Sequence, residues 1–340
     1  MLMEAIAMWC QRICVGLVLC GVLGLGARGL GGEPRPIIER LGPSPKEAGF
    51  RMEGYFVWGG SLIKVDGEYH LFASRWPKTS SFPAGYRKHS EIVHATADHP
   101  LGPYRFQEVV LAGRGGDWWD GKMCHNPKIV QSGDTYVLYY IGSARGSGLR
   151  KCGYAWSKSI DGPWRRCDQP LPFGEDHNNP GPYIHDDGRV IVAFRDRELK
   201  SFIATADRFD GTYHVAASDL FPGVRVEDFD LFRLGGKYHM VTEDNAGKFT
   251  GHERYGAHLV SDDGLKWAPH DPVCAYTHTL TWTDGSTTEA TRRERPELFN
   301  ANADRKGNGQ PTHLLTAVLV DGDTWCHVQP IAPAEDQPSR

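Results

Sequence analysis

The sequence lacks the short local motifs that identify several large enzyme classes. Its 340 residues contain no GxSxG and no phosphate-binding loop, and the GxGxxG match at 24–29 lies in the N-terminal leader, so there is no dinucleotide-binding fingerprint. Acyl transfer, phosphate chemistry and hydride transfer therefore have no positive signal. CxxC spacing is also missing, so the sequence predicts no zinc site.

An excess of one charge is missing too. The 38 basic and 42 acidic side chains are mixed along the chain and give a formal net charge of -4. No basic stripe is present to neutralise phosphates, so nucleic acid is not an expected partner. Helical periodicity is almost absent, which favours an all-β fold.

The chain has one long hydrophobic run, at its N-terminus. Arg12 precedes the apolar residues 13–27, and a Gly/Pro-rich stretch follows as far as Pro36. This order is typical of a signal peptide, and the run is shorter than the ~20 residues that span a bilayer. We expect a secreted or periplasmic protein without a membrane anchor after cleavage, with a signal peptide and leader over 1–36, one domain over 37–332 and a mobile tail over 333–340.

Cleavage of the leader leaves five cysteines, an odd number. Cys152 and Cys167 lie close enough in sequence to pair across neighbouring strands, but buried free thiols explain them equally well. No disulfide framework is implied.

Glycine, proline and tryptophan are abundant instead, with 40, 22 and 10 residues. This mixture is expected where many short strands are joined by tight turns. One repeat joins two strands around a turn containing DG, GD or GG, which is typical of an antiparallel hairpin. It occurs at 61–74, 127–143, 182–196 and 230–244, with a degenerate copy at 297–320.

A second hairpin follows each of the first four copies and carries an aromatic anchor. The anchors are Tyr104, Trp164, Tyr213 and Trp267. Two hairpins per unit and five units predict an all-β, five-bladed β-propeller in which each blade is a four-stranded antiparallel sheet.

The first strand of each blade in a propeller lies next to the central axis, so the residues that open the first repeat are expected to converge. They are WGGS (58–61), HNP (125–127), NNPGP (178–182), VEDFD (226–230) and RERPE (293–297). A polar side chain followed by proline recurs in three of these segments.

These repeats and axial segments resemble the five-bladed glycoside hydrolases of families 43 and 62 and their relatives in families 32, 68 and 117. The resemblance implies a glycosidase acting on carbohydrate, with catalytic carboxylates at the axis. It places the general acid at Glu227, followed by Asp228, and a substrate-contacting position at Asn179. In blade one, Gly59 or Gly60 stands where family 43 has its general base.

Hydrolysis of a glycoside needs a second carboxyl group, so a replacement base must be found elsewhere. Asp120, in the loop GGDWWDG (115–121), is the favoured substitute. Trp118 and Trp119 beside it, together with Trp58, are expected to stack on sugar rings.

Other motifs supply further candidates. RRERPELF (292–299) resembles the acid motif of families 32 and 68, which makes Glu294 an alternative general acid. Arg295 beside it is expected to bind either a neighbouring carboxylate or an acidic sugar. Arg195 and Asp196 resemble the Arg-Asp motif of the same families. Structural ion pairs would explain Arg195 with Asp196, and Glu294 with Arg295, equally well.

His125 and Asn126 are expected at the axis as substrate-binding residues. No spacing motif predicts a metal, and no cofactor is required; the resemblance to family 43 allows a structural calcium at the axis. The long inserts at 75–90, 112–126 and 277–293 predict a walled, exo-acting pocket.

Three functions therefore stay open. The first is an exported glycoside hydrolase, and the second is a carbohydrate-binding propeller that has lost the blade-one base. The third is a lyase or phosphorylase with an anion site at Arg195, Arg293 and Arg295.

Overall fold

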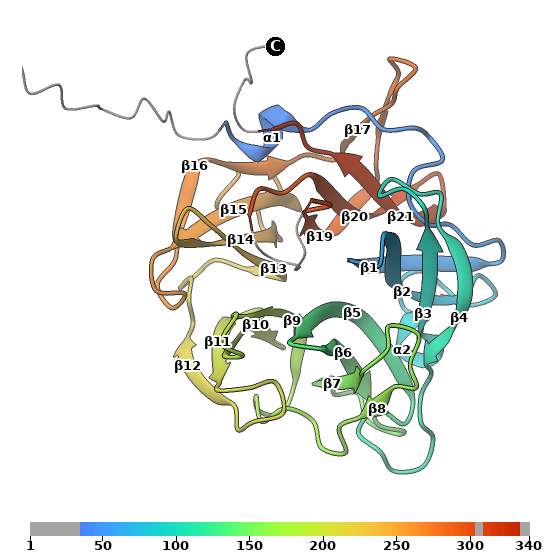
Figure 1. Cartoon of the computed structure of the whole chain (residues 1–340), viewed down its shortest axis with the longest axis vertical. Coiled ribbons are helices and arrows are strands. Elements are labelled where there is room, and N and C mark those ends of the chain that lie inside the picture. The colour runs from blue at the N-terminus through green and yellow to red at the C-terminus, as the bar shows by residue number, and fades with distance from the viewer. Residues whose placement is uncertain (1–34, 303–308, 334–340) are drawn as a thin grey trace, which may run out of the picture. The chain divides into compact units, whose positions relative to one another are not determined.

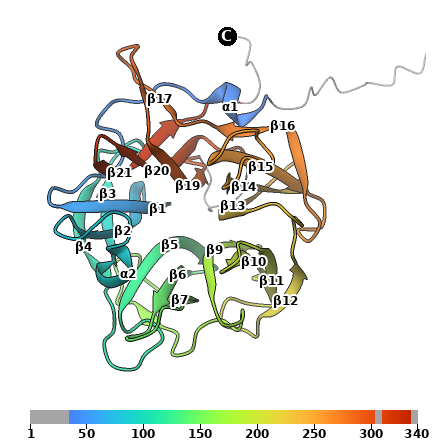
Figure 2. The ribbon, with the colours of Figure 1, turned by 180° about the vertical axis from the view of Figure 1, so that it is seen from behind.

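The computed structural model describes residues 35–302 and 309–333, and these residues form the predicted five-bladed β-propeller. Figure 1 shows the five sheets around a common centre, with β1, β5, β9, β13 and β19 innermost, and Figure 2 shows the same arrangement from behind. The expected signal peptide and nearly all of the expected tail lie outside the described residues.

Four of the sheets have the predicted four antiparallel strands, in sequence order from the axis outward. Blade one is β1 (Tyr55–Val65), β2 (Glu68–Pro77), β3 (Glu91–Ala97) and β4 (Arg105–Leu111). Blade two is β5 (Met123–Ser132), β6 (Thr135–Ser143), β7 (Lys151–Ser157) and β8 (Arg165–Arg166). Blade three is β9 (His177–Ile184), β10 (Val190–Asp196), β11 (Ser201–Ala206) and β12 (His214–Ser218). Blade four is β13 (Val226–Leu234), β14 (Lys237–Asp244), β15 (Tyr255–Ser261) and β16 (Ala268–Tyr276).

Blade five departs from the prediction of four strands. Its sheet contains β19 (Arg292–Phe299), β20 (His313–Val320) and β21 (Asp323–Pro330). The segment before blade one lies along β21 instead of a fourth strand, because Phe50 and Cys326 exchange two backbone hydrogen bonds of 2.9 and 3.1 Å. The start of the domain thus closes the ring of blades onto its end.

Three short elements complete the structure. They are α1 (Ile37–Arg40), α2 (Tyr86–His89) and the hairpin of β17 (Thr279–Thr281) and β18 (Thr287–Glu289). Helix α2 and this hairpin occupy two of the predicted long inserts. No helix among the described residues is long and apolar enough to cross a membrane.

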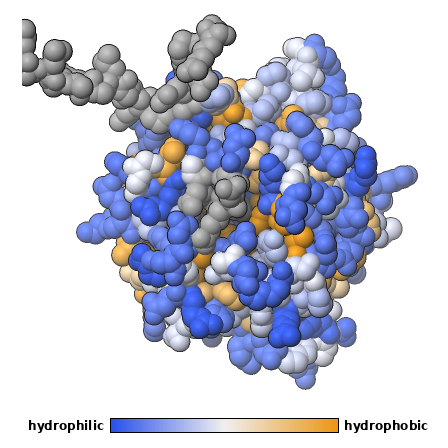
Figure 3. Space-filling view, viewed as in Figure 1, coloured by the Kyte–Doolittle hydropathy of each residue, from blue (hydrophilic) through white to orange (hydrophobic). Residues whose placement is uncertain are grey.

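Apolar side chains fill the spaces between the blades. One buried hydrophobic cluster lies between each pair of neighbouring blades, including the pair formed by blades five and one. Figure 3 shows that the face seen in Figure 1 is mostly hydrophilic, with hydrophobic residues near its middle. All five described cysteines are free thiols, so Cys152 and Cys167 are not paired.

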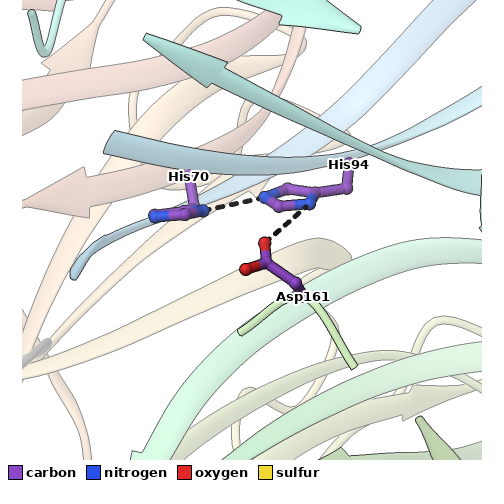
Figure 4. Close-up of side chains that lie close together, drawn as sticks. All are labelled: His70, His94 and Asp161. Carbon is purple, nitrogen blue, oxygen red and sulfur yellow. Dashed lines mark hydrogen bonds and ion pairs between the residues drawn. The ribbon is translucent and has the colours of Figure 1, made fainter. Parts of the chain in front are cut away.

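Histidine pairs connect neighbouring strands in two blades. His70 Nδ1 lies 2.9 Å from His94 Nε2 in blade one, as Figure 4 shows, and His239 Nδ1 lies 2.9 Å from His258 Nε2 in blade four. The pairs occupy matching positions, on β2 and β3 in one blade and on β14 and β15 in the other. Their recurrence identifies them as a packing feature of the blades.

Replacing Gly49 should destabilise the closure of the ring. The φ of Gly49 is +94°, and a Cβ atom there would lie 1.8 Å from the carbonyl oxygen of Cys326. We expect Gly49→Ala to lower the free energy of unfolding, measured by urea denaturation, by more than about 3 kcal/mol. Gly54→Ala is the matched control, because Gly54 has a φ of +76° but open space around it. It should cost about 1 kcal/mol, and equal losses in both variants would contradict the closure.

Acid should destabilise the fold through its buried histidines. Burial and the neighbouring His70 lower the pKa of His94 to about 4, and burial lowers the pKa of His239 to about 4. Stability that depends on neutral histidine is present above about pH 6.5 and is lost as the pH falls to about 4. We expect His94 alone to contribute about 3 kcal/mol to this loss. The free energy of unfolding, measured at successive pH values, should depend less on pH in His94→Asn than in the wild type. His89→Asn, on the exposed helix α2, is the control and should show the pH dependence of the wild type.

Candidate active site at the propeller axis

The innermost strand of every blade contains a β-bulge near its start. At each bulge one residue has a left-handed backbone, with φ between 54° and 64°. These five bulge residues are Gly59, Asn126, Asn179, Asp228 and Arg295. Gly, Asn and Asp adopt this conformation readily, whereas it is costly for arginine. The repeated bulge sets which side chains point to the axis.

The side chains of the bulge residues interact in order around the axis. Asn126 Nδ2 donates to Asn179 Oδ1 at 2.8 Å, and Asn179 Nδ2 donates to Asp228 Oδ1 at 2.5 Å. Arg295 forms an ion pair with the same oxygen of Asp228. In the alternative amide orientation, the Asn126 oxygen accepts hydrogen bonds from the Arg295 guanidinium. The resemblance implied that Asn179 contacts substrate, and in the structure it lies at the axis between Asn126 and Asp228.

Blade one contributes no side chain to this ring. A Cβ atom on Gly59 would lie 3.3 Å from both Arg295 Cγ and Asn126 Oδ1. Arg295 thus fills the sector in which the family resemblance implied a general base. Gly59, Gly60 and the other bulge residues line a cavity of about 20 Å³, the space of one water molecule.

A second polar layer lies two residues further along the inner strands. Lys128 Nζ donates to Asp230 and Glu297 at 3.2 Å each and to the carbonyl oxygen of Pro296 at 3.0 Å. Asp230 also accepts from the backbone of blade five. This layer fills the axis next to the bulge residues.

Glu227 lies beside the ring and is held as a carboxylate. Its Oε2 accepts from Arg195 Nε at 2.9 Å and Nη2 at 2.7 Å and from Asn179 Nδ2 at 3.2 Å. Its Oε1 accepts from Asn245 Nδ2 at 2.9 Å. Burial alone would raise the pKa of Glu227, but Arg195 and Arg295 outweigh burial and lower it. This environment does not suit the predicted role of general acid, which needs a bound proton at the working pH.

Asp228 has the opposite electrostatic environment. Burial raises its pKa to about 6; Arg295 opposes this shift, and the negative charges of Glu227 and Glu294 add to it. Its Oδ2 is buried and accepts no hydrogen bond from the described residues, so it is the oxygen free to carry a proton. Neighbouring carboxyl groups whose pKa values are shifted apart are the arrangement that acid/base catalysis uses.

Two further carboxyl groups and two further arginines extend this site. Arg254 Nη1 donates to Glu243 Oε1 and Glu294 Oε1, both at 2.8 Å, and Arg292 contacts the same Glu294 oxygen at 2.5 Å. Burial and the neighbouring carboxylates raise the pKa of Glu243 well above its usual range, which favours its neutral form. We call the whole set the axial charge cluster: Glu227, Asp228, Glu243, Glu294, Arg195, Arg254, Arg292 and Arg295.

Three members of the axial charge cluster were not predicted as site residues. Glu243 pairs with Glu227 across β13 and β14, so counting the hairpin register back from its turn at Gly235 and Gly236 would have found it. Arg292 opens the RRERPELF motif, two residues before the predicted Glu294. Arg254 lies in the loop before β15, and no sequence signal marks it.

The structure does not bring Asp120 to the axial charge cluster. Its carboxylate has no exposed surface and is bound by Arg114 at 2.6 Å, Arg166 at 3.1 Å and Tyr140 at 2.7 Å. Through Arg166 and Tyr140, Asp120 therefore attaches the loop before β5 to the strands of blade two. A carboxylate enclosed in this way does not support the predicted role of general base.

The predicted aromatic platform is also distributed differently. Trp119 is buried and donates to the carbonyl oxygen of Cys167 at 3.2 Å, whereas Trp118 is 43% exposed and lies under Arg114. Trp58 is buried against Phe82, and only its contact with Arg292 connects it to the cluster. Stacking of a sugar on Trp58 or Trp119 would need a change in packing.

The remaining predicted residues divide between the site and the scaffold. His125 is buried and shares a 2.8 Å hydrogen bond with Ser90, and its ring stacks on Tyr86. Asp196 accepts from the backbone of Glu198 and thereby forms the turn after β10. Arg293 points away from the axis and donates to the carbonyl oxygens of Thr277 and Thr279 and to Thr316 and Gln329, so it cannot contribute to an anion site there.

The structure does not favour the axial calcium that the resemblance allows. Asp228, Glu243 and Glu294 bring carboxylate oxygens within 4.8 Å of one another. However, Arg254 bridges Glu243 and Glu294, and Arg295 is bound to Asp228. Guanidinium groups thus supply the positive charge that calcium would bring.

The histidine pair of blade one is a poor metal site as well. Ligand atoms of His70, His94 and Asp161 lie within 4.8 Å of one another, but the two ring nitrogens of His94 face different partners, Nε2 facing His70 and Nδ1 facing Asp161 (Figure 4). A metal ion requires its ligands to converge on one point.

No family model matches the sequence, and no curated protein matches it either. The fold is similar to that of several solved structures. A family 117 glycoside hydrolase of the marine bacterium Zobellia galactanivorans has 15% identity and a TM-score of 0.64, over 88% of this chain and 91% of that one.

Two further structures give the same picture. The catalytic domain of a family 62 α-L-arabinofuranosidase of Coprinopsis cinerea has 14% identity and a TM-score of 0.62, over 87% of this chain and 98% of that one. A thermostable family 43 glycoside hydrolase has 12% identity and a TM-score of 0.60, over the same shares of the two chains. At these identities the likeness shows the fold, so the chain shares the five-bladed propeller of glycoside hydrolase families 43, 62 and 117, as the repeats predicted.

Proposed function

We propose that this protein is a glycoside hydrolase whose catalytic pair is Glu227 and Asp228. The observation that supports this most strongly is that both carboxylates accept hydrogen bonds from the same atom, Asn179 Nδ2, while their pKa values are shifted in opposite directions. The reaction class agrees with the glycosidases that share the fold.

The proposed roles differ from those that the family resemblance implied. Glu227 is ionised and oriented by Arg195, so it acts as the nucleophile toward the anomeric carbon. Asp228 donates its proton to the leaving oxygen, and it then removes a proton from the water that releases the sugar. The two oxygens lie 3.2 and 2.5 Å from the same nitrogen, so they are less than about 6 Å apart, closer than the about 6.5 to 9.5 Å of inverting enzymes.

Exo action is part of this proposal. It is supported by the long inserts at 75–90 and 277–293, which contain helix α2 and the β17–β18 hairpin, because walls around an axial site favour entry of a chain end. We further propose that the protein works outside the cytoplasm, in the secreted or periplasmic space, because residues 1–36 have the order of a signal peptide.

A second candidate is a carbohydrate-binding propeller without turnover. Two observations favour it. Arg295 fills the blade-one sector of the axis, and the carboxylates of the proposed catalytic pair are little exposed, 14% for the Glu227 side chain and 2% for that of Asp228. In this case sugars bind at the axis but no bond is cleaved.

Substitution of the catalytic pair tests the proposal directly. On a panel of aryl glycosides and plant and algal oligosaccharides, Glu227→Gln should lower kcat by about 10³-fold or more, and Asp228→Asn by about 10²-fold or more. Asp210→Asn, in an exposed ion pair with Arg208, is the control and should match the wild type.

Asp120→Asn distinguishes the proposed pair from the base expected from sequence. It should lower the melting temperature, because Asp120 holds two arginines, and leave kcat of the folded protein nearly unchanged. A loss of kcat as large as that of Glu227→Gln would restore Asp120 as the base. Sugar binding without turnover in the wild type would select the binding propeller.

The dependence of activity on pH should follow the proton on Asp228. Because its pKa is about 6, kcat/KM should decline as the pH rises through about 6, where the proton donor is lost. Glu227 has a lowered pKa, so activity should persist on the acidic side of that limb. The residual activity of Asp228→Asn should lack the decline, and an unchanged limb in that variant would assign the proton to another group.

A further inference from the structure

We propose that the sugar bound at the axis carries a carboxylate, and that the guanidinium groups of Arg254 and Arg292 recognise it. This inference rests on the function proposed above, because it names the substrate class of the same site. A uronic acid residue is the chemical class that fits.

Arg254 and Arg292 lie side by side next to the catalytic pair. Both contact Glu294 Oε1, Arg254 at 2.8 Å and Arg292 at 2.5 Å, so that one oxygen bridges the two guanidinium groups. The carboxyl group of Glu294 in turn lies within 4.8 Å of that of Asp228. A sugar whose glycosidic oxygen meets Asp228 would therefore have the two arginines within reach of its substituents.

These two arginines have donors left for a ligand. Nε and Nη2 of Arg254 and Nη1 of Arg292 make no hydrogen bond to the described residues, and the side chains are 33% and 25% exposed. Arg195, by contrast, uses Nε, Nη1 and Nη2 within the protein. Two partly exposed guanidinium groups with N–H donors left over form a site suited to the two oxygens of a carboxylate.

The backbone of Arg254 is held in an unusual conformation. Its φ is 62°, in the left-handed region that is unfavourable for a bulky residue. Its N–H donates to the carbonyl oxygen of Asp244 at 2.7 Å, and its own carbonyl oxygen accepts from His278 Nε2 at 3.2 Å. Strained conformations that the surrounding structure enforces are concentrated at functional sites, and the hydrogen bonds to Glu243 and Glu294 fix the direction of the guanidinium group.

Arg292 is oriented by aromatic rings. Its guanidinium carbon lies 5.8 Å from the ring centre of Trp58 and 5.7 Å from that of Phe82. Both cationic groups are thus positioned before a ligand arrives, which reduces the conformational entropy lost on binding.

The charge of the axial charge cluster also favours an anion. It contains four guanidinium groups and four carboxyl groups, and the buried Glu243 carboxyl favours its neutral form. Within this cluster the guanidinium groups therefore outnumber the ionised carboxylates, which favours binding of a ligand carboxylate. A neutral sugar offers these donors hydroxyl groups alone, with which guanidinium hydrogen bonds are weaker.

Calorimetric titration with matched acidic and neutral sugars tests the inference without requiring turnover. The probes are D-galacturonate and D-glucuronate against D-galactose and D-glucose, with D-galactose 6-sulfate as a third arm. We expect the wild type to bind at least one uronate about tenfold or more tightly than its neutral counterpart, with a preference that weakens as salt is added. Arg254→Gln and Arg292→Gln should each abolish most of this preference.

Arg189→Gln is the matched control, since Arg189 is paired with Asp187 at the surface and should leave the preference intact. If Arg254→Gln does not fold, Arg254→Lys retains the charge and should still reduce the preference, because lysine cannot form the two-pronged contact. Equal binding of acidic and neutral sugars, no binding of any probe, binding of the sulfate alone, or a preference that survives both substitutions would overturn the inference. The two proposals can fail separately. If the wild type cleaves neutral glycosides and Glu227→Gln does not, the glycoside hydrolase function stands although the acidic substrate class is wrong.

Discussion

The left-handed bulge in each inner strand is the constraint on which the rest of the structure depends. It brings one residue per blade to the axis, and the hydrogen bonds of the site start from these residues. Four of the five positions have Gly, Asn or Asp, which tolerate the conformation. The fifth residue, Arg295, does not tolerate it readily, and its ion pair with Asp228 offsets the conformational free energy that this costs. The same contact therefore stabilises the fold at the axis and shapes the electrostatics of the site.

Arginine is what permits so many acidic groups to be buried together. An isolated buried carboxylate is very unfavourable, and pairing with a hydrogen-bonded cation reduces this penalty. The pairing here is uneven, because Glu227 receives two nitrogens of Arg195 while Glu243 shares one nitrogen of Arg254 with Glu294. Unequal pairing shifts the pKa values of neighbouring carboxyl groups in opposite directions, which is what separates a proton donor from an ionised partner.

The parts predicted correctly from sequence are those determined by local residue patterns. Turns such as Asp66-Gly67 and Gly235-Gly236 set the hairpins, and the polar residue before proline in the inner strands marked Asn126 and Arg295 as axial. The loop residues were harder to place. Asp120 lies in a segment without periodic pattern, so its sequence neighbours did not indicate that it faces Arg114 of the same loop and Arg166 of blade two instead of the axis.

The sequence by itself determined the all-β class, the five repeats and the position of Glu227 and Asp228 at the opening of the fourth blade, because turn residues and alternation act within a few residues of one another. Only the tertiary structure decided that blade five borrows the segment before blade one, that Arg295 occupies the sector of the missing base, and that Arg254 and Glu243 join the site. Each of these depends on contacts between blades, and a propeller makes such contacts only when its ring is closed.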